Sequence, residues 1–125
     1  MAFAYTILVA GLGSRIEEFL VPMLAAQGHT VQTAVGAREI FAALEVDFDL
    51  LLVDLPSEAE LSYLHDLRVA CHCALIIIGP PRNDRLLVAS LEQGADDYVQ
   101  RPFRTDELMA RIRAQLRRVQ RDRSV

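Results

Sequence analysis

The chain contains no lysine, and all 13 of its basic residues are arginine. An arginine at any single position therefore says less about that position than it would in a chain that uses both basic residues. Acidic residues outnumber basic ones, 17 to 13, which leaves a formal net charge of −4. A domain with this balance is not expected to bind nucleic acid by itself, because affinity for DNA depends largely on positive charge facing the phosphates.

No apolar run approaches the roughly 20 residues that a helix needs to cross a bilayer. The N-terminal segment MAFAYTILVAG also lacks the basic stretch that opens a secretory signal. With 125 residues, of which 52% are hydrophobic and 24% charged, the chain fits one domain with a single core. We therefore expect a soluble cytoplasmic domain that has no contact with a membrane.

Cysteine is scarce: the only two cysteines, Cys71 and Cys73, flank His72. A structural zinc site needs four ligands, and the remaining histidines, His29 and His65, stand alone in the sequence. Cysteines separated by one residue are also poorly placed to form a disulfide. We interpret both cysteines as small apolar thiols at the entry to a buried strand, without a functional role.

The C-terminal segment is the most basic part of the chain, since residues 111–125 hold six arginines and one acid, Asp122. Such a segment can contact nucleic acid. Arginines in the last turns of a helix also complement the partial negative charge at its C-terminal end. We favour this second interpretation.

Apolar runs of strand length alternate with helix-length segments five times along the chain. Several of the runs are apolar throughout, as in strands that are covered on both faces. Ser14 with Glu17, and Ser57 with Glu60, have the spacing of helix-capping boxes, and Pro22 is expected to kink or shorten the first helix. The expected strands are 5–10, 31–35, 49–54, 74–78 and 97–100, and the expected helices are 14–28, 37–44, 57–70, 83–93 and 105–119, with Thr105 as the cap of the last.

This alternation predicts an α/β fold, namely a flavodoxin-like, doubly wound (βα)5 unit around a five-stranded parallel sheet. Right-handed crossovers favour the strand order 2-1-3-4-5. The reactive surface of such a sheet lies at the carboxyl ends of its strands. Here those ends hold Gly11, Leu12, Asp54 and Gly79.

The segment LEQGADDYVQRPF, at residues 91–103, resembles the last strand and following loop of CheY-like response-regulator receiver domains, and the resemblance extends from about residue 7 to 119. Asp54 matches the phosphoacceptor aspartate of that family. Tyr98 matches its aromatic switch residue, and Pro102 matches a proline that a cis peptide bond often precedes. Residues 1–125 are thus expected to form one receiver-like domain.

The closing segment DELMARIRAQLRR is similar to the OmpR/PhoB-type subfamily, in which it leads into a DNA-binding domain. That domain has no counterpart in these 125 residues. Residues 120–125 are expected to be a tail or the start of a linker to such an effector domain.

The departures from the family fall on its chemistry. Gly11 and Leu12 stand where family members carry the acidic pair that holds Mg²⁺. Gly79 replaces a threonine or serine that hydrogen-bonds the phosphoryl group, and Arg101 replaces a lysine. Asp54 alone is a poor ligand set for a hard octahedral ion. We therefore expect neither Mg²⁺ nor another cofactor.

The altered site predicts an atypical receiver that acts through protein contacts, without phosphorylation, as the regulatory part of a transcriptional regulator in two-component signalling. Two alternatives remain open: a conventional receiver phosphorylated on Asp54, and a sensor of a small anion or metabolite. In the second, backbone amides of residues 11–14 would hold the anion at a helix N-terminus opposite Arg101. Asp54 can also be purely structural, as the partner of Arg101.

Two further readings are not favoured. Gly11-Leu12-Gly13 echoes a dinucleotide-binding fingerprint, but its third glycine would fall at Ile16, so a nucleotide is not expected. An enzyme is also not expected, because the predicted reactive surface has no nucleophile–base pair, metal cluster or paired acids.

The resemblance also implies a homodimer built by the fourth helix, the fifth strand and the fifth helix. Positions matching Asp97 and Arg111 form salt bridges between subunits in the subfamily, and we assign Glu107 to the same surface. Leu87 replaces a basic residue there, and an exposed Leu87 would make this interface apolar. Asp97 and Arg111 could instead pair within one subunit. The other expected partner is a sensor kinase or another signalling protein, and DNA would be reached only through an effector domain.

Overall fold

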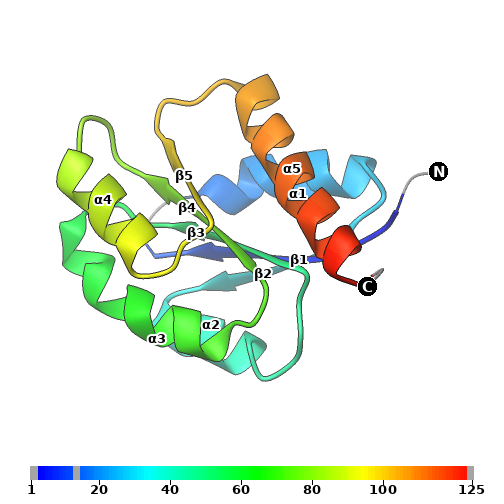
Figure 1. Ribbon diagram of the computed structural model, residues 1–125, viewed down its shortest axis with the longest axis horizontal. Helices are drawn as coiled ribbons and strands as arrows, with labels where there is room; N and C mark the ends of the chain where they lie inside the picture. Colours follow the sequence, from blue (N-terminus) through cyan, green and yellow to red (C-terminus); the bar gives the residue numbers. More distant parts are fainter. Residues whose placement is uncertain (1–2, 13–14, 124–125) are drawn as a thin grey trace.

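A computed structural model describes residues 3–12 and 15–123 and has a five-stranded parallel sheet between two layers of helices (Figure 1). The strand order is β2-β1-β3-β4-β5, which confirms the predicted topology. The strands are β1 (Thr6–Gly11), β2 (Thr30–Val35), β3 (Leu50–Asp54), β4 (Ala74–Gly79) and β5 (Asp97–Gln100). The helices are α1 (Ile16–Ala26), α2 (Ala37–Ala43), the 3₁₀ helix η1 (Glu58–Leu61), α3 (Ser62–Ala70), α4 (Asp84–Glu92) and α5 (Thr105–Arg123).

One face of the sheet is covered by α1 and α5, and the other face by α2, α3 and α4 (Figure 1). Successive side chains of a strand point to opposite faces, so a strand covered on both sides must be apolar at nearly every position. β3 shows this directly, because Leu50 and Leu52 pack toward α1 and α5 while Leu51 and Val53 pack toward the other helices. Within the described ranges, no helix is both long and apolar enough to cross a membrane.

Capping residues set several helix ends, and the Ser57–Glu60 pair was predicted from the sequence. Ser57 accepts a backbone hydrogen bond at 3.2 Å and donates one to Glu60 at 2.7 Å, although this pair starts η1 rather than α3. The side chain of Asn83 accepts a hydrogen bond from the Leu86 N–H at 3.0 Å and caps α4. Gly94 follows α4 with a φ of 109°, a conformation that glycine adopts without strain.

The first and last helices differ from the expectation at their ends. Arg15 is the N-cap of α1 and makes no side-chain capping bond, while Ser14, the expected cap, lies outside the described residues. Pro22 lies inside α1 and does not end it. Thr105 is the first residue of α5 rather than its cap, and residues 120–123 belong to the last turn of that helix.

His29 is held against the N-terminal end of β1. Its Nδ1 accepts a hydrogen bond from the Tyr5 backbone N–H at 3.2 Å, and the centres of the two rings lie 5.7 Å apart. A protonated Nδ1 cannot accept this bond. Burial also lowers the pKa of His29 from its ordinary value of 6.5, so the fold favours the neutral imidazole.

We predict that acid weakens the fold partly through His29. Because its pKa is lower in the folded chain than in the unfolded one, its contribution to the free energy of unfolding is complete above the unfolded pKa of 6.5. That contribution is lost as the pH falls from there toward the folded pKa. Urea unfolding at about pH 7.5 and about pH 5.5 should therefore show a larger loss for the wild type than for His29→Gln. The exposed-site variant His65→Gln should follow the wild type, and identical pH dependence of all three proteins would contradict the prediction.

Candidate functional site

The carboxyl ends of four strands lie side by side at one end of the sheet. This end, where the strands stop, is the edge meant below. Gly11 of β1 is paired in register with Asp54 of β3, and Gly79 of β4 with Gln100 of β5. The next residue, Arg101, donates its backbone N–H to the Gly79 carbonyl at 2.8 Å. In doubly wound α/β folds this edge is where ligands bind. The fold thus assembles the site positions that the sequence had singled out.

Asp54 lies at the centre of this edge, and its side chain is 0% exposed. Its carboxylate forms an ion pair with the guanidinium of Arg101, which also donates to the Leu55 carbonyl at 3.4 Å. Neither carboxylate oxygen accepts a backbone hydrogen bond from the described part of the chain. Partial burial lowers the pKa of Arg101, but an arginine in a protein keeps its proton. Arg101 is therefore the group that compensates the buried charge of Asp54.

Tyr98 is turned into the molecule and fills the space beside Gly79. The tyrosine is 6% exposed, its hydroxyl is buried without a hydrogen-bond partner among the described residues, and burial raises its pKa. A Cβ added to Gly79 would fall on the Tyr98 hydroxyl oxygen and lie 2.9 Å from Cε2 of the ring. The lack of a side chain at Gly79 is thus what admits this orientation of Tyr98. The sequence had given the two positions separate roles, and their contact is new.

The end of β1 brings an apolar side chain, rather than acids, to this edge. Gly11 is buried, and the side chain of Leu12 packs against the core under α2, α3 and α4. Glu18 pairs with Arg15 at 3.3 Å on the surface, and one carboxylate oxygen of Glu17 is buried without a described hydrogen-bond partner. In residues 3–12 and 15–123, no three His, Cys, Asp or Glu side chains are grouped so that they could hold a metal ion.

Gly13 and Ser14, which complete the glycine-rich turn after β1, lie outside the described residues. The anion site expected at the amides of residues 11–14 therefore stays a prediction. The same holds for the expectation that this turn binds no nucleotide.

The surface formed by α4, β5 and α5, which we call the α4–β5–α5 surface, contains an ionic cluster. Arg111 binds both carboxylate oxygens of Asp97 at 3.0 Å, and its Nε lies 3.3 Å from the carboxylate of Glu107. The hydrogen bond that Arg111 donates to Asp97 raises the pKa of Arg111. In a single copy of the chain, the three residues thus form the internal pairing that the sequence left open as an alternative.

α4 exposes apolar side chains, but Leu87, whose exposure would have made this surface apolar, is not one of them. Leu86 is fully buried under α4. Leu87 is the next residue along the helix and is half-buried against the same core. Val88 and Leu91 point outward instead, with exposed fractions of 50% and 45%. They are three residues apart and therefore share one stripe of the helix.

Cys71 and Cys73 form a disulfide, so the expectation of two free thiols is wrong. Cys71 follows α3 in an extended conformation, and the chain turns at His72 so that the two Cα atoms are 5.4 Å apart. This separation lies within the range that a disulfide requires. Spacing alone did not reveal the bond, because the separation depends on the turn between α3 and β4.

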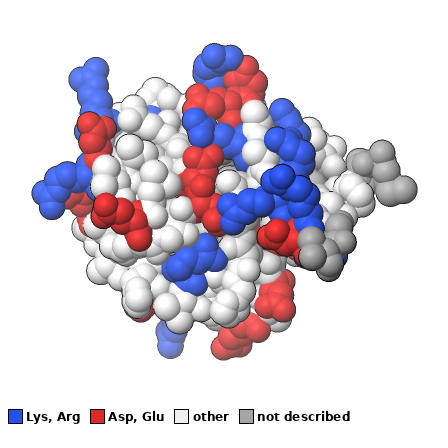
Figure 2. Space-filling model, in the orientation of Figure 1, with Lys and Arg blue, Asp and Glu red and all other residues white. Residues whose placement is uncertain are grey.

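Basic side chains gather over α5 on the face shown in Figure 2. Arg121 and Arg123 lie in the last turn of α5, as the helix-dipole interpretation expects. The end of this helix is also attached to the sheet, since Arg123 forms an ion pair with Asp49 and Arg118 lies 2.8 Å from Asp96. No local sequence pattern indicates these pairs, because their members are distant along the chain.

The chain is similar to curated bacterial proteins over most of its length, although no protein-family model matches it. It is 34% identical over 116 residues to protein PetR of Rhodobacter capsulatus, an alignment that covers 90% of this chain and 49% of PetR. It is 33% identical over 115 residues to the DNA-binding response regulator MtrA of Mycolicibacterium paratuberculosis, covering 90% of this chain and 51% of MtrA. The chain thus spans about half the length of the curated relatives it matches.

Solved structures share the fold over nearly the whole chain. A CheY-like response-regulator receiver domain protein from Methanospirillum hungatei superposes with a TM-score of 0.83 at 24% sequence identity. The match covers 96% of this chain and 99% of that one. Identity at this level shows a common fold, which is the fold that the alternating strands and helices predicted.

We predict that Arg101→Met destabilises the protein by about 3–5 kcal/mol, because it leaves the buried Asp54 carboxylate unpaired. Adding Asp54→Asn removes that charge and should restore at least about 1 kcal/mol of the free energy of unfolding in urea. Arg85→Met is the matched control, because the contact of Arg85 with Glu58 is 4.0 Å long and lies on the surface. Its effect should stay below about 0.5 kcal/mol. An Arg101→Met protein as stable as the wild type would show that the ion pair does not hold Asp54.

Proposed function

The chain belongs to the response-regulator family as a receiver domain, and we propose that it is an atypical receiver that signals through protein contacts without being phosphorylated. The observation that carries this proposal is the state of Asp54. Its carboxylate is fully buried and bound in an ion pair with Arg101. Arg101 lies against one of the two carboxylate oxygens, and both oxygens are buried, so a phosphodonor would reach the carboxylate only after Arg101 or the surrounding side chains had moved.

The replacements around Asp54 also remove the groups that make phosphoryl transfer fast. The transfer brings one anion onto another, and a bound Mg²⁺ normally offsets their repulsion. Two unit charges about 4 Å apart repel by about 4 kcal/mol at an effective dielectric of 20, which corresponds to roughly a 10³-fold loss of rate. With Gly11 and Leu12 in place of acids, the described part of the chain places no group of three His, Cys, Asp or Glu side chains here that could hold Mg²⁺ together with Asp54.

Tyr98 supports the same proposal. A phosphorylated receiver needs an element with two arrangements that the phosphoryl group can bias. Here the Tyr98 ring occupies the space beside Gly79 and is buried. Gly79 has no hydroxyl that could contact a phosphoryl group and move with it. On this proposal, the inward tyrosine would not depend on phosphate.

The output of the domain would be made through the α4–β5–α5 surface, by homodimerisation. Val88 and Leu91 supply exposed apolar area there, beside the ionic cluster of Asp97, Glu107 and Arg111. Exchange of the Asp97–Arg111 pair between two copies would fix their register more than their affinity.

The chain would then work as the regulatory half of a longer transcriptional regulator. It spans about half of relatives such as the DNA-binding response regulator MtrA, and contact with DNA would be made by an effector domain outside these residues. We place the protein in the cytoplasm, without membrane contact. Its upstream partner would be a sensor kinase or another signalling protein.

We predict that the protein takes up no phosphoryl group from a small acyl phosphate in the presence of Mg²⁺. Intact-mass spectrometry should show unmodified protein, because Arg101 occupies the Asp54 carboxylate and the metal ligands are missing. Rapid phosphorylation of the wild type on Asp54 would overturn the proposal in favour of a conventional receiver.

The matched control is the triple variant Gly11→Asp, Leu12→Asp and Arg101→Lys, which restores the acidic pair and the lysine of the family. Circular dichroism would establish that this variant is folded. Its rate of phosphorylation should exceed that of the wild type by roughly 10³-fold. Adding Asp54→Asn to the triple variant should abolish the modification.

We predict that the wild type dimerises through this surface. Leu91→Glu should weaken the dimer at least about tenfold, or about 1.4 kcal/mol, because it puts a charge where the dimer would bury an apolar side chain. Sedimentation velocity over a range of concentrations measures this change. Val69→Glu is the control, since Val69 is 63% exposed but lies on α3. A monomeric wild type, or equal weakening by both variants, would contradict dimerisation through this surface.

A further inference from the structure

We propose that Cys71 and Cys73 form a thiol–disulfide redox site, and that its state is transmitted to α5 through Arg68 and Asp96. The disulfide lies in the connection between α3 and β4, at the edge of the sheet opposite Asp54. Cys71 is 3% exposed, whereas Cys73 is partly exposed. Cys73 lines two cavities, of about 370 and about 420 Å³, so a thiol can approach it.

Cys73 is the more exposed cysteine and lines both cavities, whereas Cys71 is buried and lines one of them, so we assign the first attack to Cys73. The thiolate of a cellular monothiol or dithiol attacks Cys73 Sγ, the Cys71–Cys73 bond breaks, and Cys71 Sγ leaves as a thiolate. The backbone N–H of Cys73 lies 3.3 Å from Cys71 Sγ and is placed to stabilise that charge. A second reductant thiol then attacks the mixed disulfide. Two protein thiols result, the reductant becomes a disulfide, and its two protons end on the cysteines.

A purely structural role explains this bond less well. A cross-link between residues two apart closes a minimal loop, and the stabilisation that a disulfide provides falls as its loop shortens. In the cytoplasm, where the proposed function puts this protein, persistent structural disulfides are rare and redox-sensing ones are the usual kind.

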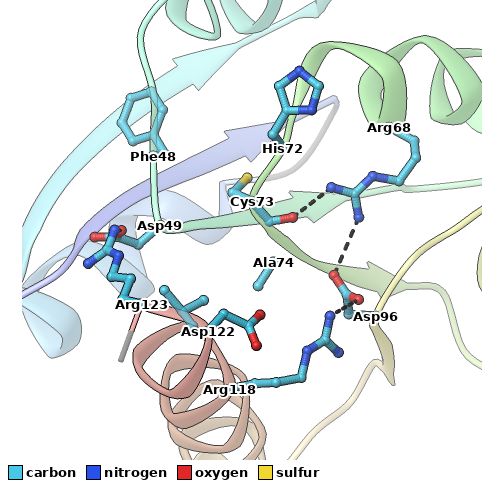
Figure 3. A pocket seen from close by; sticks show the side chains of 11 residues that line it. Phe48, Asp49, Arg68, His72, Cys73, Ala74, Asp96, Arg118, Asp122 and Arg123 are labelled. Carbon is cyan, nitrogen blue, oxygen red and sulfur yellow. Dashed lines mark hydrogen bonds and ion pairs between the residues drawn. The ribbon is translucent and has the colours of Figure 1, made fainter. Parts of the chain in front are cut away.

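Arg68 connects the disulfide loop to the rest of the domain. One terminal nitrogen of Arg68 donates to the carbonyls of Cys71 and Cys73, at 2.5 and 2.6 Å. The other donates to the Gly94 carbonyl at 3.1 Å and lies 3.4 Å from Asp96. Figure 3 shows Arg68 reaching from α3 to both the Cys73 carbonyl and Asp96. A change in the loop must therefore alter the hydrogen bonds of Arg68.

Asp96 is the next link, because it is shared between Arg68 and α5. One of its carboxylate oxygens accepts the Leu75 N–H at 2.8 Å and faces Arg68. The other binds Arg118 of α5 at 2.8 Å, from the opposite side of the cavity in Figure 3. Opening the disulfide releases the two carbonyls from their fixed separation, so Arg68 shifts and the Asp96–Arg118 contact shifts with it.

The redox site itself is tested by trapping free thiols with an alkylating reagent in glutathione buffers of increasing oxidised fraction, followed by mass spectrometry. The folded protein should pass from two alkylated cysteines to none across the series, and excess dithiothreitol should restore both. Two free thiols in every buffer, or a disulfide that resists dithiothreitol in the folded protein, would overturn the proposal.

The connection to α5 is tested by amide NMR on the same protein before and after reduction. Reduction should shift the amide signals of Asp96 and Arg118 as well as those of residues 71–75, whereas in Arg68→Met the shifts should be confined to the loop. The double variant Cys71→Ser/Cys73→Ser should not respond to dithiothreitol and should resemble the reduced wild type at Asp96 and Arg118. Unchanged signals at both residues on reduction of the wild type would refute the connection. Neither readout involves Asp54, so the result is independent of phosphorylation.

Discussion

The ion pair between Asp54 and Arg101 is the interaction on which the chemistry of this receiver domain depends. A carboxylate buried at the end of a parallel sheet is stable only with a partner of opposite charge, and Arg101 is that partner here. Gly11, Leu12 and Gly79 lack side chains that could bind Mg²⁺ or a phosphoryl oxygen, and among the described residues Arg101 is the partner recorded for the Asp54 carboxylate. The fold of the family is retained, and the carboxylate at the phosphoacceptor position is fully buried against Arg101.

The same helix meets both edges of the sheet. α5 begins just after the segment that carries Arg101 and the cis peptide bond to Pro102, and its last turns reach Asp96 and Asp49 at the opposite edge. A structural change at either end of the strands would therefore alter the contacts of α5. This arrangement would suit the output that we propose for the α4–β5–α5 surface.

The sequence predicted most of the fold and the positions of the site, but not the contacts that define its state. Continuous apolar runs identify buried strands by themselves, and β5 was predicted with its observed bounds because its flanking turn residues are local signals. The packing of Tyr98 over Gly79, the disulfide and the Arg118–Asp96 pair depend on three-dimensional proximity, which no local pattern encodes. The resemblance pointed to Leu87 as a position of the interface, but it did not indicate how α4 is rotated against the core, and Leu87 is partly buried there.

The measurement that tests the central claim most directly is an amide NMR titration with Mg²⁺ and then with beryllofluoride, which mimics a phosphoryl group on an aspartate. With Asp54 held by Arg101, we expect the signals of Asp54, Gly79 and Tyr98 to stay unchanged while the spectrum remains that of the folded protein. Saturable shifts at these three residues would mean that the site still accepts a phosphoryl group, and they would contradict the proposal that Arg101 keeps Asp54 from being phosphorylated.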